Sequence, residues 1–431
     1  MRLLWATFLF LLLLPYSSPQ FAQAAESYSL KDAFLSAVMR SDNIGVQKEL
    51  LVQASELKTQ ASGALFPTLG GSVSLLKQSP TLDSEGVVVS RSNQNTVKLS
   101  LSQPLFRGFR DFAALRQKGD QVEAQNFTLQ NAAKQLFYDL ATAFYNVLLQ
   151  KGDEKNYLNE IEVNQKRLKE LQAFYRIGRS QLSDVLTLKS NISSLEAQLE
   201  STRTQLETAK DVLAYMTGWN RDSALQDLET IPGESSPVTA YLSLMDRRPD
   251  IRLAVANVQS FEEGVPIARG AHFPSADIFG DYYLVAPQNV KTPDWDIQFL
   301  LTIPIFQGGV IQSQVRQALS AVRQYNHLLS DARKTAEEEI RTFYDAFVGD
   351  QRQMNKLTET VVITRETYEV EVRDYRNGLL TNLDVLQAIT TFQDSQRLLD
   401  RQRTLVKLDA AKLQAATAQR PEVDLHLEVK K

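Results

Sequence analysis

The chain has 431 residues, of which 43% are hydrophobic and 23% are charged, with a formal net charge of −4 at pH 7. It contains no cysteine and three dispersed histidines, which argues against disulfides, thiolate nucleophiles and metal or catalytic sites built from imidazole. The acidic balance and the lack of a basic run argue against nucleic acid as a partner, and we expect no cofactor.

The chain begins with an apolar stretch that has the features of a secretory signal. Leu3 to Leu14 follows Arg2 and precedes the small-residue sequence Ala22-Gln23-Ala24. We predict a signal peptide at residues 1–24. The alternative is a retained anchor, but an apolar core of twelve residues is short for crossing a bilayer.

Helices dominate the next part of the chain. The pattern predicts a helix from about Leu30 to Leu65, a long helix from about Phe109 to Ile177, and a returning helix from about Leu182 to Thr217. The long helix would measure about 100 Å, and the two shorter ones, about 54 Å each, would stack end to end beside it. Gly119 and Gly152 are positions where the long helix could bend.

The returning helix carries apolar residues every seven positions, which is the pattern of a coiled-coil seam. These residues are Val185, Ile192, Leu199, Leu206 and Leu213, and a second series comprises Val385, Phe392, Leu399, Val406 and Leu413. The seven-residue period also occurs before Gly178 and before Gly378. Each glycine is therefore predicted to join two antiparallel helices.

Between the helices, apolar and polar residues alternate, which predicts strands. The clearest are Val97 to Ser102 and Trp295 to Ile303, with Thr68 to Gln78 and Ser275 to Ala286 as partners. They form hairpins at about 68–105 and 275–305, with strands of about ten residues, the length that crosses a bilayer when tilted. The predicted strand–helix junctions are Pro67, Pro104, Pro274 and Pro304, because proline cannot donate to a strand ladder.

The chain is an internal duplication. Tyr175, Gly178 and Asp184 recur 200 positions later as Tyr375, Gly378 and Asp384. We divide the chain into a first structural repeat at 25–218, a linker or equatorial segment at 219–248, a second repeat at 249–417 and a C-terminal tail at 418–431. Helices of the second repeat are predicted at about Asp250 to Ala271, Val310 to Asn377 and Thr381 to Thr417.

Four strands cannot close a barrel, so the chain is expected to oligomerise. Its outward strand positions are apolar, and unpaired strand edges are not tolerated in lipid. Three copies would supply twelve strands, the smallest such assembly with an aqueous lumen. The predicted fold is mainly α with a transmembrane β part, in which a trimer shares a long antiparallel coiled-coil α-barrel and a twelve-stranded β-barrel.

Several paired motifs resemble those of one family. They are GALFP at 63–67 with GAHFP at 270–274, PLFRG at 104–108 with PIFQG at 304–308, RPDI at 248–251, and the paired glycine turns. In these features the chain resembles TolC-type outer-membrane efflux proteins over about Leu30 to Thr417. The resemblance implies a homotrimer in the outer membrane of a Gram-negative bacterium, in contact with outer-membrane lipid and with its helical part in the periplasm.

The resemblance also implies function and partners. The chain would be a non-enzymatic exit duct of a tripartite efflux or type I secretion system, served by a periplasmic adaptor and an inner-membrane transporter. The RPDI segment resembles the branch that works with proton-driven multidrug pumps. Drugs, metal ions and polypeptides all pass through proteins of this pattern, so the cargo stays open.

In the family, the helix turns form the periplasmic end of the duct. The resemblance therefore makes the turns candidate adaptor-docking sites, comprising Gly178, Arg179, Gly378, Leu379, Leu380 and Thr381. The simpler interpretation is that each glycine only supplies a left-handed turn, and the two roles are compatible.

Asp184 and Asp384 follow the turns and are candidates for a ring of carboxylates at the aperture, with Tyr175 and Tyr375 as gate candidates. The alternatives are helix capping for the aspartates and coiled-coil packing for the tyrosines. Family members can latch the aperture with an arginine and an additional acid. Leu380 and Gln387 occupy those positions here, so we do not expect that latch.

Two other classes of protein share some of these features. A periplasmic coiled-coil adaptor or scaffold would also be exported and rich in heptads, but it would not need lipid-facing strands. A secreted hydrolase has little support, because the chain lacks a glycine-rich nucleophile turn and its histidines are dispersed.

Overall fold

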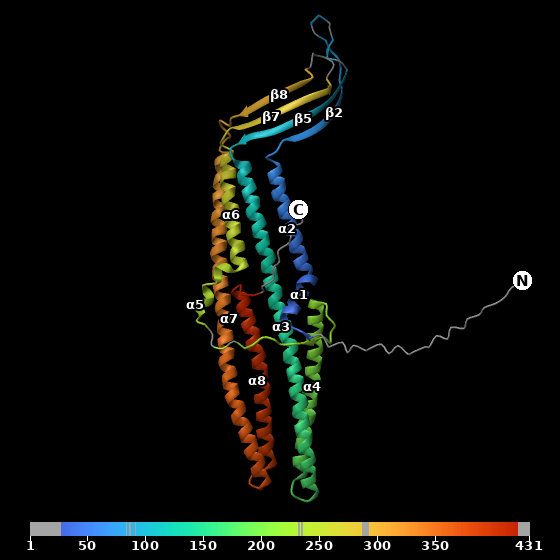
Figure 1. Ribbon diagram of the computed structural model, residues 1–431, viewed down its shortest axis with the longest axis vertical. Coiled ribbons are helices and arrows are strands. Elements are labelled where there is room, and N and C mark those ends of the chain that lie inside the picture. The colour runs from blue at the N-terminus through green and yellow to red at the C-terminus, as the bar shows by residue number, and fades with distance from the viewer. Residues whose placement is uncertain are drawn as a thin grey trace, which may run out of the picture.

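The computed structural model describes residues 27–420, except 83, 86–87, 91, 232, 234–235 and 287–292. The predicted signal peptide, and all of the predicted tail beyond residue 420, lie outside the described residues. The molecule is long and narrow, with a β-sheet at one end and two helical turns at the other (Figure 1). Within these residues, no helix combines the length and the hydropathy needed to cross a membrane.

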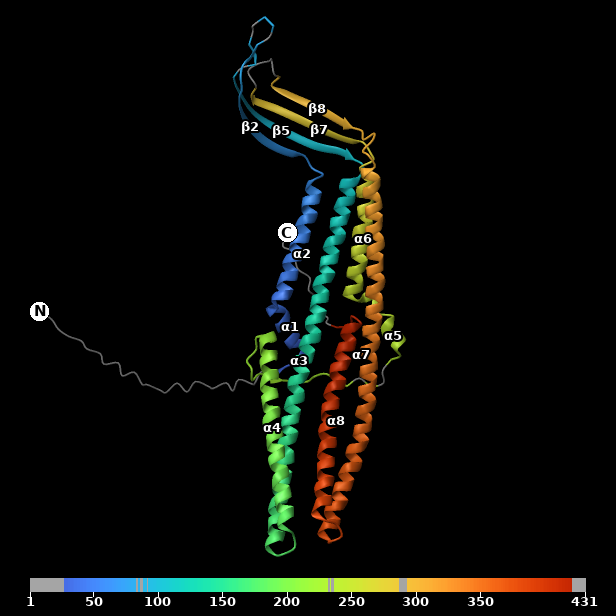
Figure 2. The same cartoon turned by 180° about the vertical axis from the view of Figure 1, so that it is seen from behind.

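Two helices of 67 residues each, α3 (Arg110–Arg176) and α7 (Val310–Arg376), run from the sheet to the turns. In the half near the turns, α3 pairs with α4 (Leu182–Thr217) and α7 pairs with α8 (Asn382–Ala416), as Figures 1 and 2 show. The predicted bounds of these helices agree with the structure to within one residue. The α3 helix also continues through Gly119 and Gly152.

In the half near the sheet, α2 (Asp42–Gly63) packs on α3, and α6 (Pro249–Gly270) packs on both α3 and α7. The predicted single helix from Leu30 to Leu65 is wrong, because it is divided at Ser41 into α1 (Leu30–Arg40) and α2. Ser41 has an extended backbone and its hydroxyl accepts from the Ile44 amide, so it ends one helix and caps the next.

The sheet has the order β2 (Thr68–Lys77), β5 (Asn93–Arg107), β7 (Ser275–Val285) and β8 (Trp295–Thr302). All of its neighbouring strands are antiparallel. The two predicted hairpins are therefore confirmed, and the β5–β7 pairing joins them into one sheet. The smaller elements are β1 (Ser27–Tyr28), β3 (Thr81–Leu82), β4 (Val88–Ser90), β6 (Ala224–Leu225), α5 (Val238–Leu242) and a 3-10 helix, η1 (Met245–Arg247).

The strand register separates a polar face of the sheet from an apolar one. Ser100 is opposite Asp281, which is opposite Asp296, and these positions alternate with Leu101, Gly280 and Ile297. On the polar face, Lys98 Nζ lies 2.5 Å from Asp281 Oδ2. The alternation predicted from the sequence is confirmed, because period-two residues of neighbouring strands share a face.

Three of the four predicted junction prolines lie next to a strand end, and one does not. Pro67 and Pro274 immediately precede β2 and β7, and Pro304 follows the end of β8 at Thr302. The prediction for Pro104 is wrong, because β5 continues to Arg107. Beyond Ser102, β5 no longer pairs with β2, and its register with β7 is irregular there, so a residue without an N–H is tolerated.

The largest apolar core lies at mid-length, where helices from both repeats meet. Phe34 of α1, Phe144 of α3, Leu213 of α4 and Ala411 of α8 are all buried in it. The helices α1, α4 and α8 end or begin near this level. The core therefore packs the ends of these stacked helices against α3.

Arg248, just before α6, is fully buried and connects several helices. Its Nη1 donates to the Ala416 carbonyl oxygen at the end of α8 at 2.8 Å. Its Nε and Nη2 donate to Asp250 of α6 at 3.0 and 2.6 Å, and Nη2 also contacts Glu339 of α7. Lys134 of α3 completes the cluster through Asp250, 3.0 Å away.

These contacts set the charge state of Asp250. Burial by itself would raise its pKa, but hydrogen bonds and charge from Arg248 and Lys134 outweigh burial and hold the pKa at about 2. Because this folded-state pKa is below the unfolded value, the contact stabilises the fold above about pH 4 and is lost as the pH falls towards 2.

We predict that Arg248→Met destabilises the protein by about 3–5 kcal/mol, because it leaves two half-buried carboxylates and a helix-end carbonyl without their partner. Thermal unfolding of the helices, followed by circular dichroism in detergent, measures this effect. The matched control is Arg333→Met, which removes an exposed arginine 3.5 Å from Asp246 and should change stability by less than about 1 kcal/mol. Equal effects of the two substitutions would contradict the prediction.

Candidate functional site: the helical tips

The two turns at the far end of the helices, which we call the tips, have the same backbone geometry. Gly178 and Gly378 have φ of 74° and 76°, in the left-handed region. Their amides donate to the carbonyl oxygens of Tyr175 and Tyr375, each at 3.0 Å. The prediction that these glycines supply left-handed turns is confirmed, and the duplicated sequence produces a duplicated turn.

Asp184 and Asp384 each form a capping box at the start of the returning helix. Asp184 Oδ2 accepts from the Gln181 amide at 3.2 Å and from the Ser180 hydroxyl at 2.9 Å. Asp384 Oδ2 accepts from the Thr381 hydroxyl at 2.6 Å and from its amide at 2.8 Å. Hydrogen bonds from Thr381 lower the pKa of Asp384, so this carboxylate is ionised near neutral pH. Both aspartates are half-buried, and each has a local role that accounts for its position.

The two gate-candidate tyrosines differ in their surroundings. Tyr175 is 43% exposed. Tyr375 is half-buried against the first helical pair, with the Arg167 guanidinium 5.4 Å and the Phe174 ring 6.5 Å from its ring centroid. Burial raises the pKa of Tyr375, and the charge of Arg167 partly opposes this. Tyr375 therefore contacts the neighbouring pair as well as its own, which the heptad pattern did not predict.

Much of the tip surface is apolar and exposed. Leu379 is 73% exposed, Leu380 is half-buried, and the Arg179 guanidinium lies over the Phe174 ring at 5.7 Å. Further exposed apolar residues near the turns are Ile177, Leu182, Leu186 and Leu383. Sequence analysis missed these four, although apolar residues outside the heptad seam beside a turn are a signal that could have identified them.

The helical pairs α3–α4 and α7–α8 are called hairpins from here on, as distinct from the β-hairpins of the sheet. Within each of them, the contact between the two helices is apolar. The heptad residues Val185, Leu199 and Leu206 of α4 are buried, as are Val385 and Val406 of α8. The predicted coiled-coil seams are thus confirmed.

Between the two hairpins, a strip of polar groups joins α3 to α8, beside an apolar cluster in which Leu386 and Ile389 of α8 pack with residues of the first hairpin. Arg401 Nη1 lies 2.5 Å from Asp153 Oδ2, and Arg397 Nη1 lies 3.0 Å from Glu160 Oε1. Nearer the tip, Arg167 of α3 donates to Asn382 of α8. Sequence analysis missed this inter-hairpin strip, for which the seven-residue spacing of Asp153 and Glu160 was a signal.

Burial strongly affects the acids of this strip. The carboxyl side chains of Asp153 and Glu160 are 4% and 6% exposed. Burial raises the pKa of Glu160 to about 7, although the charge of Arg397 partly offsets it. Burial likewise raises the pKa of Asp153, which Arg401 partly offsets. The hairpins are therefore joined by groups that are costly to bury, unlike the seams within them.

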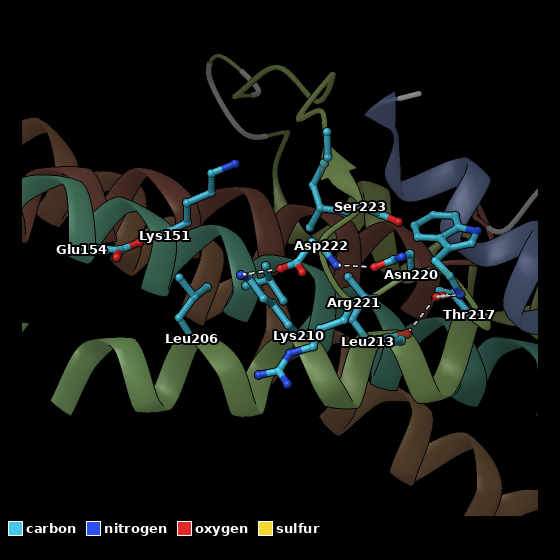
Figure 3. A pocket seen from close by; sticks show the side chains of 15 residues that line it. Lys151, Glu154, Leu206, Lys210, Leu213, Thr217, Asn220, Arg221, Asp222 and Ser223 are labelled. Atoms are coloured by element: carbon cyan, nitrogen blue, oxygen red, sulfur yellow. Dashed lines mark hydrogen bonds and ion pairs between the residues drawn. The ribbon is translucent and has the colours of Figure 1, made fainter. Parts of the chain in front are cut away.

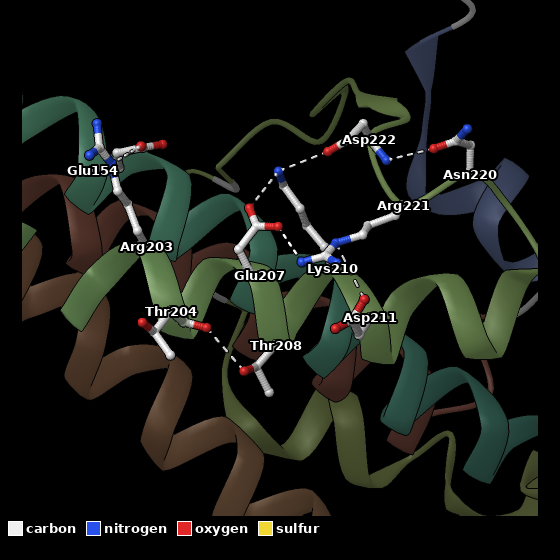
Figure 4. Close-up of polar contacts among 10 residues, drawn as sticks. All are labelled: Glu154, Arg203, Thr204, Glu207, Thr208, Lys210, Asp211, Asn220, Arg221 and Asp222. Atoms are coloured by element: carbon white, nitrogen blue, oxygen red, sulfur yellow. Dashed lines mark hydrogen bonds and ion pairs between the residues drawn. The ribbon is translucent and has the colours of Figure 1, made fainter. Parts of the chain in front are cut away.

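At mid-length, the linker covers a pocket of about 220 Å³ between α3 and α4 (Figure 3). Lys210 of α4 lies 3.0 Å from Glu207 and 3.1 Å from Asp222 of the linker, and Arg221 contacts Glu207 and Asp211 (Figure 4). These mostly exposed pairs fasten the linker to α4 and contribute little stability each. In the described part of the chain, no group of three or more His, Cys, Asp or Glu residues could hold a metal ion.

Comparisons with known proteins agree on one family. The family described as outer membrane efflux protein matches residues 37–219 and 241–419. Outer membrane protein TolC of Escherichia coli K12 is 22% identical over 397 residues, which cover 86% of this chain and 78% of TolC. Pyoverdine export outer membrane protein OpmQ of Pseudomonas aeruginosa is 23% identical over 394 residues, covering 88% and 81% of the two chains.

A solved structure has the same fold. The outer membrane protein VceC from Vibrio cholerae superimposes with a TM-score of 0.76 at 20% identity, covering 90% of this chain and 95% of VceC. At this identity the similarity shows the fold, a helical barrel continued by a β-barrel.

We predict that Gly178→Ala and Gly378→Ala each destabilise a tip by about 1–2 kcal/mol, since a side chain disfavours positive φ. No neighbouring atom lies within 4 Å of an added Cβ at either site, so the cost comes from the backbone alone. Gly349→Ala in α7 is the control, with similar open space and no positive φ. It should be neutral or stabilising. Hydrogen exchange at the tips measures the effect, and unchanged exchange in both tip variants would contradict it.

Proposed function

Because the chain belongs to the outer membrane efflux protein family, we propose that three copies form the exit duct of a tripartite efflux or type I secretion system. The protein is an outer-membrane channel with a periplasmic helical part, and such channels are not enzymes. The proposal adds the number of chains, the partners and the path of the cargo. The observation that carries it is the four-stranded sheet with two free edges.

The edges of the sheet require neighbours. Among the described residues, β2 and β8 form the two ends of the strand order, and every residue of β2 is exposed. In hydrocarbon each unpaired backbone N–H or C=O group costs several kcal/mol. Summed over an edge strand, this cost is at least roughly the free energy of unfolding of a small domain. Pairing of β2 with β8 of another copy removes both edges, and three copies close twelve strands around an aqueous bore.

The two faces of the sheet suit this arrangement. The apolar face carries Leu69, Ile297 and Phe299, which are 72%, 69% and 59% exposed in the single chain. We assign this face to lipid. The opposite face carries the Lys98–Asp281 ion pair, which we assign to the water-filled bore.

Exposed aromatic residues support a membrane boundary at the junction of sheet and helices. Phe66, Phe109, Phe112, Phe273 and Phe306 are between 53% and 87% exposed and lie close to strand ends. Aromatic girdles mark the interfaces of transmembrane barrels, so we place the periplasmic edge of the outer membrane here. The tips then point away from that membrane, towards the cell interior.

We assign adaptor docking to the tips, where exposed apolar residues gather. Leu379 and Leu383 of the second tip, and Ile177 and Leu182 of the first, offer a surface for the helical hairpins of a periplasmic adaptor. An inner-membrane transporter would supply the energy. No observation favours the alternative of an adaptor or scaffold, and an adaptor would not need an apolar sheet face.

The tip aspartates are assigned a second role besides capping. In a trimer, Asp184 and Asp384 would bring six carboxylates towards one axis at the aperture, and such a ring favours cations. The capping geometry is compatible with this role, because each cap uses Oδ2 as its acceptor. The latch that some family members form with an arginine and an additional acid is not proposed, since Leu380 and Gln387 occupy those positions.

We predict that Asp184→Asn combined with Asp384→Asn lowers cation selectivity in planar bilayers. Asparagine retains a capping oxygen and removes the charge, so the change isolates electrostatics. Asp32→Asn is the matched control, since Asp32 forms the same capping box with Ser29 at the start of α1, far from the tips. Single-channel reversal potentials measure the effect, and selectivity equal to wild type in the double variant would remove the ring from the proposal.

We predict that chemical cross-linking of native envelopes yields products of up to three chains and no larger ones. We also predict that Leu379→Asp abolishes export and leaves this trimer intact. A charge on the exposed tip leucine should prevent apolar docking, while the sheet edges are untouched. Leu228→Asp, an exposed leucine of the linker, is the control and should export normally. Solitary chains or pairs would overturn the proposed assembly, and normal export by Leu379→Asp would overturn the docking assignment.

A further inference from the structure

A second concave site lies between the two hairpins, away from the tips. It encloses about 300 Å³ and is lined by residues of α3, α7 and α8, among them Asn156, Glu160, Tyr368, Phe392, Gln393 and Gln396. This inter-hairpin cavity adjoins the polar strip, through Glu160. Its volume is at the lower end of the range for small-molecule sites.

One side of the cavity is aromatic. The rings of Tyr368 from α7 and Phe392 from α8 are nearly parallel, with an interplanar angle of 5° and centroids 6.2 Å apart. Both residues line the cavity and both are half-buried. Phe392 belongs to the heptad series predicted from the sequence, but it is less buried than Val385 or Leu399 of that series. An aromatic face that the seam leaves partly open can contact a cation or a ring.

Around the cavity, acidic groups exceed basic ones. Glu160 is paired with Arg397, but Arg397 is shared with Asp394. Glu371, one turn along α7 from Tyr368, has a buried carboxylate oxygen without a hydrogen-bond partner in the described part of the chain. Two carboxylates, those of Glu160 and Asp394, thus share the Arg397 guanidinium.

The amide groups add a further unused acceptor. Asn164 is fully buried one turn from Glu160, and its Nδ2 donates to the Glu160 carbonyl oxygen at 2.8 Å and to Gln393 Oε1 at 3.5 Å. Its Oδ1 has no partner among the described residues. A buried acceptor without a donor is costly, so the polar strip beside the cavity is not fully satisfied by its own groups.

We propose that the inter-hairpin cavity binds a small organic cation, an ammonium group bearing an aromatic or alkyl substituent. The ammonium would lie near the Glu160 carboxylate, and the substituent would contact the Tyr368 and Phe392 rings. Such a ligand touches α3 from one hairpin and α7 and α8 from the other, so its binding also links the hairpins. The site depends on residues of a single chain and is separate from the carboxylate ring at the tips.

Binding should depend on pH. The pKa of Glu160 is about 7, and the groups that face it are Asp153 on α3, with Asp394 and Arg397 on α8. Tyr368 lines the cavity from α7. Because a cation prefers ionised Glu160, affinity should rise about tenfold between pH 6 and pH 8.

The test is calorimetric titration of the full protein, purified in detergent, with benzyltrimethylammonium as the probe. We expect saturable binding to wild type with a Kd on the order of 1 mM or tighter. Glu160→Gln, which removes the charge, and Phe392→Leu, which removes the ring but keeps apolar packing, should each weaken binding about tenfold. Circular dichroism melting establishes that each variant is folded.

Glu162→Gln is the matched control, since Glu162 lies on the same helix and its exposed carboxylate pairs with Lys166. It should bind as wild type does, and benzyl alcohol, which lacks the charge, should not bind. Absence of saturable binding up to about 10 mM would overturn the proposal, as would binding that both Glu160→Gln and Phe392→Leu leave unchanged. Neither result bears on the exit duct, which cross-linking and export test in the absence of the probe.

Discussion

Every backbone N–H and C=O group in the hydrocarbon of a membrane needs a hydrogen-bond partner, and this requirement governs the organisation of the molecule. Within the sheet of this chain, β5 and β7 satisfy the requirement because each is paired on both sides. The end strands β2 and β8 are each paired on one side. The closure by other copies that we propose would pair the two remaining edges.

Two kinds of contact hold the helical part together. The seams inside each hairpin are apolar and follow a regular heptad, which gives stiff rods. The contact between the rods in the half near the tips combines an apolar cluster, which includes Ile389 of α8, with ion pairs and amides, including the Glu160–Arg397 pair. Because polar contacts with buried charges are close to neutral in free energy, they hold the hairpins in register at a small cost for separating them. The inter-hairpin cavity lies at that contact.

The helices of the two repeats also meet in the mid-length region. There the helices of both repeats share one apolar core, and Arg248 ties the ends of α6 and α8 to α3 and α7. Shorter helices end at this level, so their unpaired carbonyl groups need donors, and a buried guanidinium provides one to Ala416. The largest apolar core of the helical part is thus at mid-length, and the ion pairs between the hairpins lie towards the tips.

Local patterns in the sequence determined much of this protein. The helices, strands and turns follow from heptads, period-two alternation and the glycines at 178 and 378, because each of these depends on residues close in the sequence. The 200-residue repeat in the sequence then predicts each element a second time. The tip glycines and the capping propensity of the aspartates follow from such short-range geometry. The tertiary structure decided what depends on distant partners. It divided the first helix at Ser41, carried β5 past Pro104 where β2 had ended, buried Arg248 among four helices, and placed Glu160 opposite Arg397, 237 positions away. Sequence spacing can place Asp153 and Glu160 on one helix face, but it does not identify their partners, since the energy of a buried charge is set by groups that only folding brings within hydrogen-bond distance.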